Sequence, residues 1–208
     1  MQNTNKIKLP YIILTAAVLW FIMFSPWTKT HINFWLAMTI SGSLLIILSL
    51  ISGNKFWKNI HFSIRDIIIG FVSALFMWLV FWIGNFLSVH LFNFAAPQVN
   101  AIYGLKAGSD SVIIALLLLF IIGPAEEIFW RGFVMERLSE KWGPWLGFAS
   151  ATLIYASIHI WSFNFMLVMA ALICGIFWGL LYKFNRNLLT IVISHAIWDV
   201  MVFVIFPI

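Results

Sequence analysis

Ionisable side chains interrupt the apolar segments of this chain at a few positions, and these positions are the first candidates for chemistry. Glu126 and Glu127 follow a long apolar run, Arg131 lies four positions after Glu127, and Asp199 lies within another apolar run. Placing such a group at bilayer depth costs about 2.5–3.5 kcal/mol. Ionisable residues inside membrane segments usually face the interior of a helix bundle, where they mark a functional site.

The two adjacent glutamates differ in the partners that helical geometry offers them. Glu127 and Arg131 share one helix face at a spacing of four residues and are expected to form an ion pair. Glu126 is turned about 100° from Glu127 and has no such partner. Pro124 is expected to bend the helix just upstream and to let water approach Glu126. Glu126 is therefore a candidate base for the activation of water. The alternative is that both glutamates join a salt-bridge network that serves packing alone.

Two more pairs recur at a spacing of four residues, so that the members of each pair share a helix face. They are Tyr155 with His159, and His195 with Asp199. The alternative for His195 and Asp199 is a pair that satisfies itself inside the bundle, and for His159 it is an interfacial role. From a rise of about 1.5 Å per residue, Glu126, His159, His195 and Asp199 are predicted to meet in one pocket, in the cytoplasmic half of the membrane.

Two histidines and a carboxylate are also the ligand types of a catalytic zinc site, which commonly has three protein ligands and one open position. His159, His195 and Glu126 would be the ligand set if the protein uses a divalent metal such as zinc. The zinc-binding pattern HExxH is absent from the sequence. The residues alone leave both possibilities open, and activation of water without a tightly held metal is the preferred interpretation.

The composition is that of a membrane protein. Of the 208 residues, 63% are hydrophobic and 9% are charged, and the mean hydropathy is +1.02, whereas soluble domains are about 45–50% apolar and about 25% charged. Apolar stretches of about 20 residues can span a bilayer. They predict an all-α fold, a polytopic transmembrane helix bundle of about seven spans with a polar intramembrane cavity. The predicted spans are Tyr11–Trp27, Asn33–Ser52, Asp66–Leu87, Ser111–Arg137, Trp145–Trp161, Phe165–Lys183 and Leu188–Phe206.

The basic residues predict the orientation of these spans. The net charge is +5, but the basic residues lie between the apolar runs and form no patch for nucleic acid, so no nucleic-acid partner is expected. Nine of them fall in segments expected on the inner side: Lys6, Lys8, Lys55, Lys58, Arg65, Arg137, Lys141, Lys183 and Arg186. Only Lys29 and Lys106 fall outside, so the positive-inside rule predicts a cytoplasmic N-terminus and an extracytoplasmic C-terminus. The connection from Phe92 to Asp110 is expected to be a lid or a simple extracytoplasmic loop.

The motifs together resemble those of a known family. Glu126-Glu127-x-x-x-Arg131, Tyr155-x-x-x-His159 and His195-x-x-x-Asp199, on three spans in this order, resemble the CPBP family of CAAX-protease and bacteriocin-processing membrane proteins. These are also called Abi proteins and are related to Rce1-type prenyl-protein endopeptidases. The resemblance implies one membrane domain over residues 1–208, in which residues 111–208 form a catalytic core of four spans. Residues 1–110 would then hold three variable spans and a loop.

The resemblance implies an intramembrane endopeptidase that acts on membrane-associated peptides or proteins. In the family's pattern Glu126 activates water and His159 is its partner, while His195 and Asp199 stabilise the tetrahedral intermediate or complete the polar site. Glu127 and Arg131 would be supporting structure. This sequence has Tyr155 where the family usually has Phe and Asp199 where it often has Asn. An ionised carboxylate cannot donate a hydrogen bond to an oxyanion, so Asp199 is expected to orient His195.

Other classes of function stay open at this stage. One alternative is a non-catalytic membrane immunity or scaffold protein that binds a peptide such as a bacteriocin. A proton- or ion-coupled transporter would also bury Glu and His, but it predicts internal repeats and broken helices at matching positions, and none is found. The frequent Ile, Phe, Lys and Asn residues favour a bacterial source, so the expected location is a bacterial cell membrane.

Overall fold

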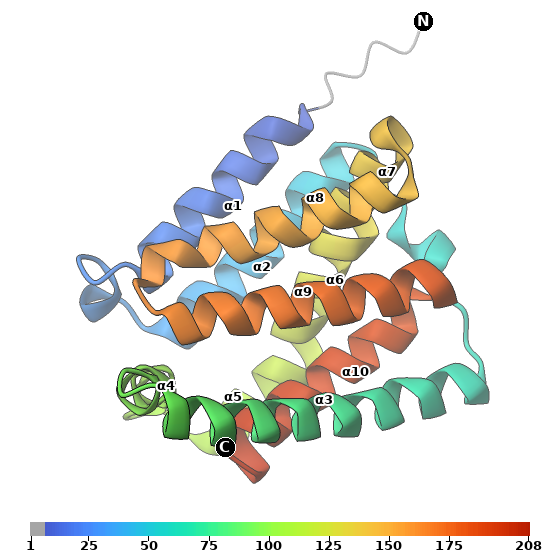
Figure 1. The fold of residues 1–208 in the computed structure, drawn as a ribbon. Coiled ribbons are helices and arrows are strands. Elements are labelled where there is room, and N and C mark those ends of the chain that lie inside the picture. The colour runs from blue at the N-terminus through green and yellow to red at the C-terminus, as the bar shows by residue number, and fades with distance from the viewer. Residues whose placement is uncertain (1–6) are drawn as a thin grey trace, which may run out of the picture.

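The computed structural model describes residues 7–208, which form helices joined by short connections and contain no strand (Figure 1). The α-helices are α1 (Leu9–Phe24), α2 (Phe34–Ile51), α3 (Ile64–Leu91), α4 (Ala95–Tyr103), α5 (Ser111–Leu117), α6 (Gly123–Phe129), α7 (Glu136–Trp142), α8 (Pro144–Ser157), α9 (Phe165–Asn185) and α10 (Leu188–Val200). The predicted all-α bundle is confirmed. Lys6, one of the basic residues used to predict orientation, lies outside the described residues.

Polar side chains fix where several of these apolar helices begin. Asn33, Asn164 and Asn187 are the N-cap residues of α2, α9 and α10, and each side chain accepts a hydrogen bond from a backbone N–H of the first turn. Asp110 caps α5 in the same way, with its carboxylate 2.8 Å from the amide nitrogen of Val112. Such caps satisfy backbone donors that have no partner within the helix.

The helices from α5 to α7 form one rod from Ser111 to Trp142, and the regular α-helix is interrupted twice within it. The turns Leu118–Ile122 and Trp130–Met135 are π-helical, and α6 lies between them with both glutamates. Pro124, near the start of α6, has no backbone N–H, so the preceding turn cannot complete a regular hydrogen-bond ladder. Single π-helical turns occur frequently at functional sites. A third π-helical segment, Met201–Ile205, extends α10 and begins two residues after Asp199.

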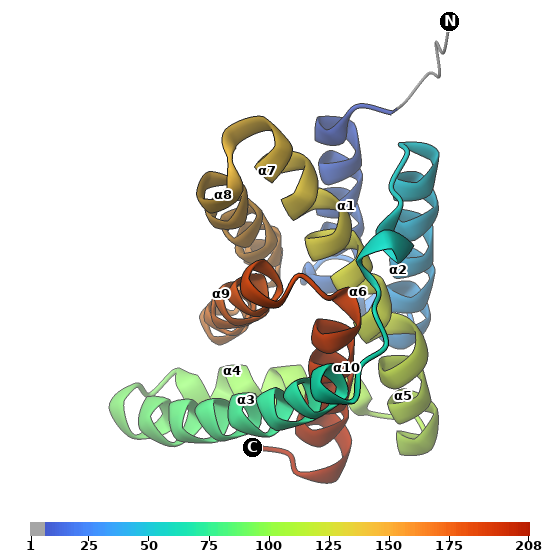
Figure 2. The same cartoon turned by 90° about the vertical axis from the view of Figure 1, so that its right-hand side faces the viewer.

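Helix α10 lies in the interior of the bundle and packs on α3, α6 and α9 (Figure 2). Small residues allow these close contacts. A Cβ atom at Gly70 of α3 would lie 2.8 Å from the carbonyl oxygen of Thr190, and one at Gly123 would lie 3.0 Å from the Cα atom of Ala196. Helix α9 packs on α8 through Gly175 and Gly179 in the same manner. Small residues at crossings are typical of helix packing in membranes.

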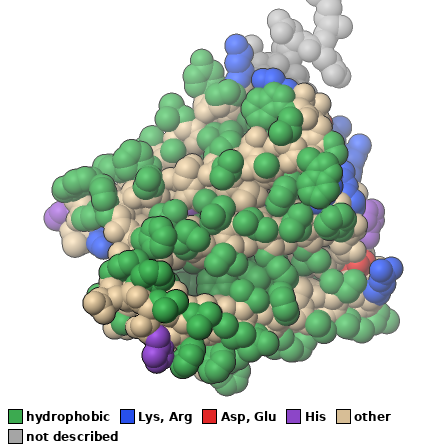
Figure 3. All heavy atoms as spheres, viewed as in Figure 1, with side chains coloured by type: hydrophobic (Ala, Val, Ile, Leu, Met, Phe, Trp, Pro, Cys, Tyr) green, Lys and Arg blue, Asp and Glu red, His purple; other side chains and the backbone are tan. Residues whose placement is uncertain are grey.

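Five helical segments of the described chain are long and apolar enough to cross a bilayer: Phe34–Ile51, Ile64–Leu91, Ser111–Trp142, Phe165–Asn185 and Leu188–Ile205. Leu9–Phe24 is apolar but has 16 residues, and α8 has 14. The count of seven spans therefore stays a prediction. Hydrophobic side chains cover the face seen in Figure 3, as expected for a protein surrounded by lipid. The chain is an integral membrane protein.

Basic side chains gather at one end of the bundle (Figure 3). We call this the basic end and define it by Lys8, Lys55, Lys58, Arg65, Arg137, Lys141, Lys183 and Arg186, which lie at or next to helix ends. Helix α1 begins at this end. The C-terminal residue Ile208 lies at the opposite end, where its backbone N–H donates to the hydroxyl of Tyr103.

The connection from Phe92 to Asp110, expected to be a lid or a simple loop, contains the helix α4. Gln98 ties α4 to the start of α9, because its backbone carbonyl accepts a hydrogen bond from the Asn164 side chain at 2.7 Å and its side chain accepts one from the Met166 backbone at 2.9 Å. In the sequence this segment is short and contains Pro97, so its helical pattern was not recognised. Helix α4 covers the cavity described next.

Candidate active site

A cavity of about 510 Å³ occupies the half of the bundle away from the basic end. Its walls come from the end of α1, the start of α2, the later half of α3, α4, the first part of the Ser111–Trp142 rod, the end of α8, the first half of α9 and the end of α10. The five predicted residues that border it are Glu126, Tyr155, His159, His195 and Asp199. The structure therefore brings the candidates from three motifs to one hollow.

The pocket was predicted in the half of the membrane that holds the basic end, but the cavity opens in the other direction. Glu126 lies at the middle of the rod Ser111–Trp142, and His195 lies seven residues, about 10.5 Å, from the start of α10 at the basic end. The depth of these polar residues in the bilayer stays a prediction. From them the cavity extends towards α4 and the C-terminus.

Glu126 faces the cavity and is held by a single hydrogen bond. The hydroxyl of Tyr155 donates to its Oε2 at 2.9 Å. No basic side chain of the described residues forms an ion pair with Glu126. The residue was expected to have no charged partner, and the structure agrees, but the contact with Tyr155 was not foreseen. The hydroxyl that distinguishes this sequence from the family's usual Phe therefore touches the candidate base.

Glu127 points away from the cavity and is fully buried. Its Oε1 accepts a hydrogen bond from Arg131 at 2.6 Å, which confirms the predicted ion pair, and another from Nδ1 of His195 at 2.6 Å. Arg131 also donates to the backbone carbonyl of Cys174 on α9 at 3.1 Å. This small network joins the rod, α9 and α10. The second carboxylate oxygen of Glu127 is buried with no hydrogen-bond partner among the described residues.

The imidazole of His195 is fixed on three sides. Its Nδ1 donates to Glu127, its ring stacks on Trp178 with a centroid distance of 3.8 Å, and its Nε2 lies 3.5 Å from Oδ2 of Asp199. The last distance is longer than a good direct hydrogen bond. His195 and Asp199 do share a face, as predicted, and both border the cavity. A water molecule or a substrate oxygen at this wall would therefore reach both Nε2 and Oδ2.

His159 was expected to be the partner of Glu126, but its hydrogen bonds are to other residues. Its Nδ1 lies 2.8 Å from the backbone carbonyl of Tyr155, and its Nε2 accepts a hydrogen bond from the indole N–H of Trp20 at 3.1 Å. Both ring nitrogens are thus engaged, in the neutral form that donates from Nδ1. Glu126 is bonded to the Tyr155 hydroxyl rather than to His159.

Trp20 of α1 was missed by the sequence analysis. Its contact with His159 joins residues 139 positions apart, and an indole N–H within an apolar span does not show which acceptor it will meet. Trp178, which stacks on His195, was missed for the same reason: an aromatic residue within an apolar run resembles any other core residue.

The residues of the site do not fit a catalytic zinc ion. In the described part of the chain, no three His, Cys, Asp or Glu side chains come together as a metal-binding group. Within the proposed set of His159, His195 and Glu126, the lone pair of His159 is used by Trp20, and Nδ1 of His195 is used by Glu127. A three-ligand site would require these hydrogen bonds to break.

Comparison with known protein families identifies a match to part of the chain. Residues 108–201 match the model of the Rce1-like family, described as type II CAAX prenyl endopeptidase Rce1-like. No curated protein and no solved structure matches the chain. The matched range contains all three motifs, and it begins after α4, so the first three long helices contribute nothing to it. The region that holds the candidate site therefore matches the Rce1-like family of CAAX endopeptidases, as the motifs indicated.

Proposed function

We propose that this protein is an intramembrane endopeptidase in which Glu126 activates a water molecule for attack on a peptide bond. The supporting observation is the contrast between the adjacent glutamates. Glu127 is neutralised by Arg131 and His195, whereas Glu126 faces a cavity with only the Tyr155 hydroxyl on its carboxylate. With no cation beside it, the Glu126 carboxylate keeps an oxygen free to accept a proton from a water molecule in the cavity.

In the proposed reaction, Glu126 takes one proton from water as the oxygen attacks the substrate carbonyl carbon. The carbonyl oxygen then bears the negative charge of the tetrahedral intermediate. His195 is placed to stabilise this oxyanion from Nε2, because Glu127 holds its Nδ1 and Trp178 holds its ring plane. Glu126 returns the proton to the leaving amine as the C–N bond breaks, which yields one carboxylic acid and one amine.

The other polar residues act through these two. Asp199 faces Nε2 of His195 and attracts the positive charge of an imidazolium, whose Nε2 would donate a hydrogen bond to the oxyanion. Arg131 compensates the charge of Glu127 and so keeps Glu127 as a hydrogen-bond acceptor. His159 holds the backbone of Tyr155 and thereby the hydroxyl that orients Glu126. Each step uses side chains already at the cavity, and no step requires a tightly held metal.

Replacement of Glu126 tests this proposal. The purified protein, reconstituted in liposomes, is presented with candidate membrane peptides, and the cleavage products are identified by mass spectrometry. Glu126→Gln keeps the shape of the side chain but removes its basicity, so cleavage should fall by about 10²- to 10⁴-fold. The control is Glu140→Gln, because the Glu140 side chain is 63% exposed at the basic end. Undiminished cleavage by Glu126→Gln would remove Glu126 from the mechanism.

The competing function is binding without cleavage, as in an immunity or scaffold protein. It predicts that the wild-type protein retains a bound peptide intact and that Glu126→Gln binds it equally well. A protease predicts cleavage by the wild type and capture of uncleaved substrate by Glu126→Gln. Mass spectrometry of the peptides that co-purify with the two forms separates these functions, and it also identifies the substrate.

A further inference from the structure

We propose that the substrate reaches the cavity sideways from the lipid, through the gap between α3 and α9, in the leaflet opposite to the basic end. The substrate class would be an uncharged, apolar peptide segment that lies in the extracytoplasmic leaflet. This inference rests on the proposed endopeptidase function and names where its substrate comes from.

The exposed part of the cavity wall shows where the opening lies. Most of the residues that border the cavity are buried or half-buried, and four are exposed: Gly84, Phe92, Phe165 and Ile173. All four belong to two neighbouring walls, the end of α3 with its C-cap and the first half of α9. A residue that borders the cavity and also faces the outside marks the rim of an opening. Figure 3 shows a hollow between α9 and α3, next to α4.

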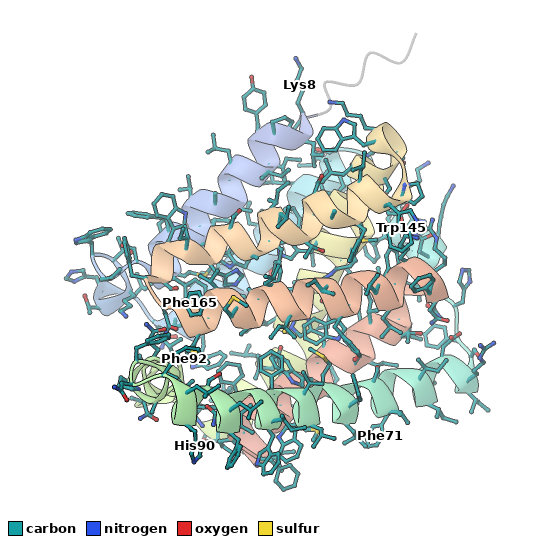
Figure 4. The ribbon with its side chains drawn as sticks, in the orientation of Figure 1. Lys8, Phe71, His90, Phe92, Trp145 and Phe165 are labelled. Atoms are coloured by element: carbon teal, nitrogen blue, oxygen red, sulfur yellow. The ribbon has the colours of Figure 1, made fainter. Side chains whose placement is uncertain are left out.

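Aromatic contacts close this gap at both ends. Towards the basic end, Phe76 of α3 stacks on Phe177 of α9 at a centroid distance of 5.9 Å. Towards α4, Phe94 meets Phe165 edge to face at 5.9 Å. Figure 4 shows Phe92 and Phe165 at this second end. The opening is therefore a lateral window of limited length between two helices.

The α3 side of this window is built of small and polar residues. Gly84, Asn85 and Ser88 border the cavity there, and a Cβ atom at Gly84 would meet nothing within 4 Å. The Oδ1 atom of Asn85 is buried and has no hydrogen-bond partner among residues 7–208. An extended peptide in the window would present backbone N–H groups that need an acceptor in an apolar setting. Asn85 is placed to supply that acceptor.

The sidedness follows from the distribution of charge. The eight residues of the basic end lie opposite the cavity, where the described chain has only Lys29 and Lys106. Lys106 is engaged, since its amine donates to the Phe203 carbonyl at 2.7 Å. The positive-inside rule places the basic end in the cytoplasm, and hence the cavity in the extracytoplasmic half of the membrane. The rim residues are uncharged, so a charged segment would lose its hydration without gaining a partner.

Two labelling measurements test the inference without any use of catalytic activity. For sidedness, Phe92→Cys and Trp142→Cys are made in a Cys174→Ala background. The two positions are matched in exposure, at 48% and 46%, and lie at opposite ends of the bundle. A membrane-impermeant maleimide added to intact cells should label Phe92→Cys, while Trp142→Cys should be labelled only after permeabilisation. The reverse pattern would overturn the assignment of the leaflet.

For the route, Ala170→Cys in the same background places a thiol on the α9 wall of the cavity. A lipid-soluble maleimide should label it in membranes. Gly84→Trp should abolish most of this labelling, because the indole fills the open side of the window, and a helix tolerates tryptophan better than glycine. The control is Leu87→Trp on the same helix, which is half exposed and does not border the cavity. Equal labelling in both variants would refute access between α3 and α9.

These results are separable from the proposed chemistry. If Glu126→Gln retains full cleavage, the mechanism fails while the labelling results still define the window. If the labelling contradicts the window while Glu126→Gln abolishes cleavage, the protein is a protease with another route for its substrate. With both correct, Gly84→Trp should also abolish cleavage of a membrane-embedded peptide, whereas Leu87→Trp should leave it unchanged.

Discussion

The buried network around Glu127 permits a quantitative prediction about Arg131. The Glu127 side chain is fully buried and that of Arg131 is 4% exposed, with 2.6 Å between the paired atoms. Arg131→Met keeps most of the apolar volume but leaves the carboxylate with His195 as its only partner. Removing one member of a buried ion pair costs about 3–5 kcal/mol, because the other charge is left uncompensated. The free energy of unfolding should fall by about that amount.

The matched experiment is a double-mutant cycle. Glu127→Gln combined with Arg131→Met removes both charges, while the amide oxygen at position 127 can still accept the hydrogen bond from His195. The double variant should therefore be more stable than Arg131→Met alone, with a coupling energy of about 1–3 kcal/mol. Reversible unfolding in detergent gives the free energy of unfolding of the wild type, the two single variants and the double variant. A coupling energy near zero would refute the view that Arg131 exists to compensate Glu127.

Three further predictions concern the neighbouring parts of the site. Tyr155→Phe removes the hydrogen bond that orients the Glu126 carboxylate, so kcat for peptide cleavage should fall by up to about a hundredfold. The free energy of unfolding should fall by up to about 1.5–3 kcal/mol, the contribution of a hydrogen bond to a charged acceptor. Gly70→Val forces side-chain atoms against α10 and should lower the free energy of unfolding, measured by thermal unfolding, by about 1–3 kcal/mol. Gly84→Val places its side chain in open space and should not lower it. A chelator should leave cleavage unchanged, and elemental analysis of the active protein should find no stoichiometric zinc; loss of activity restored by zinc would contradict this.

Contacts within one helix could be predicted from the sequence, and contacts between helices could not. The spacing of Glu127 and Arg131 placed them on one face, and the structure confirms their pair. The hydrogen bond from His195 to the same carboxylate joins residues 68 positions apart, and no periodicity gives the rotation of α10 against the rod. The sequence analysis therefore assigned His195 to Asp199 alone, which is its weaker contact at 3.5 Å.

The same limit applies to the depth of the cavity and to its cover. Apolar runs located the helices to within a few residues, but the basic end of the rod was placed too early, at Arg137 instead of Trp142. The pocket was predicted in the half with the basic end, whereas the cavity extends from the polar residues away from that end. Helix α4 was missed because a nine-residue segment with a proline has little helical signal of its own. Its position depends on the hydrogen bonds of Gln98 to the start of α9.

The two adjacent glutamates now have distinct physical explanations. A helix turns about 100° between neighbouring residues, so one carboxylate can face the interior of the bundle while the next faces the cavity. Glu127 takes the inward direction and is neutralised there by Arg131. If Glu127 were apolar, Arg131 would be a buried cation without compensation and His195 would lose the acceptor that fixes its ring. The inner glutamate thus positions the histidine that faces the cavity, and this leaves Glu126 as the carboxylate whose charge no cation neutralises. In the proposed hydrolysis, Glu126 would act beside the donor on α10 that Glu127 orients, so the two neighbouring positions of α6 would serve the base and the placement of its partner.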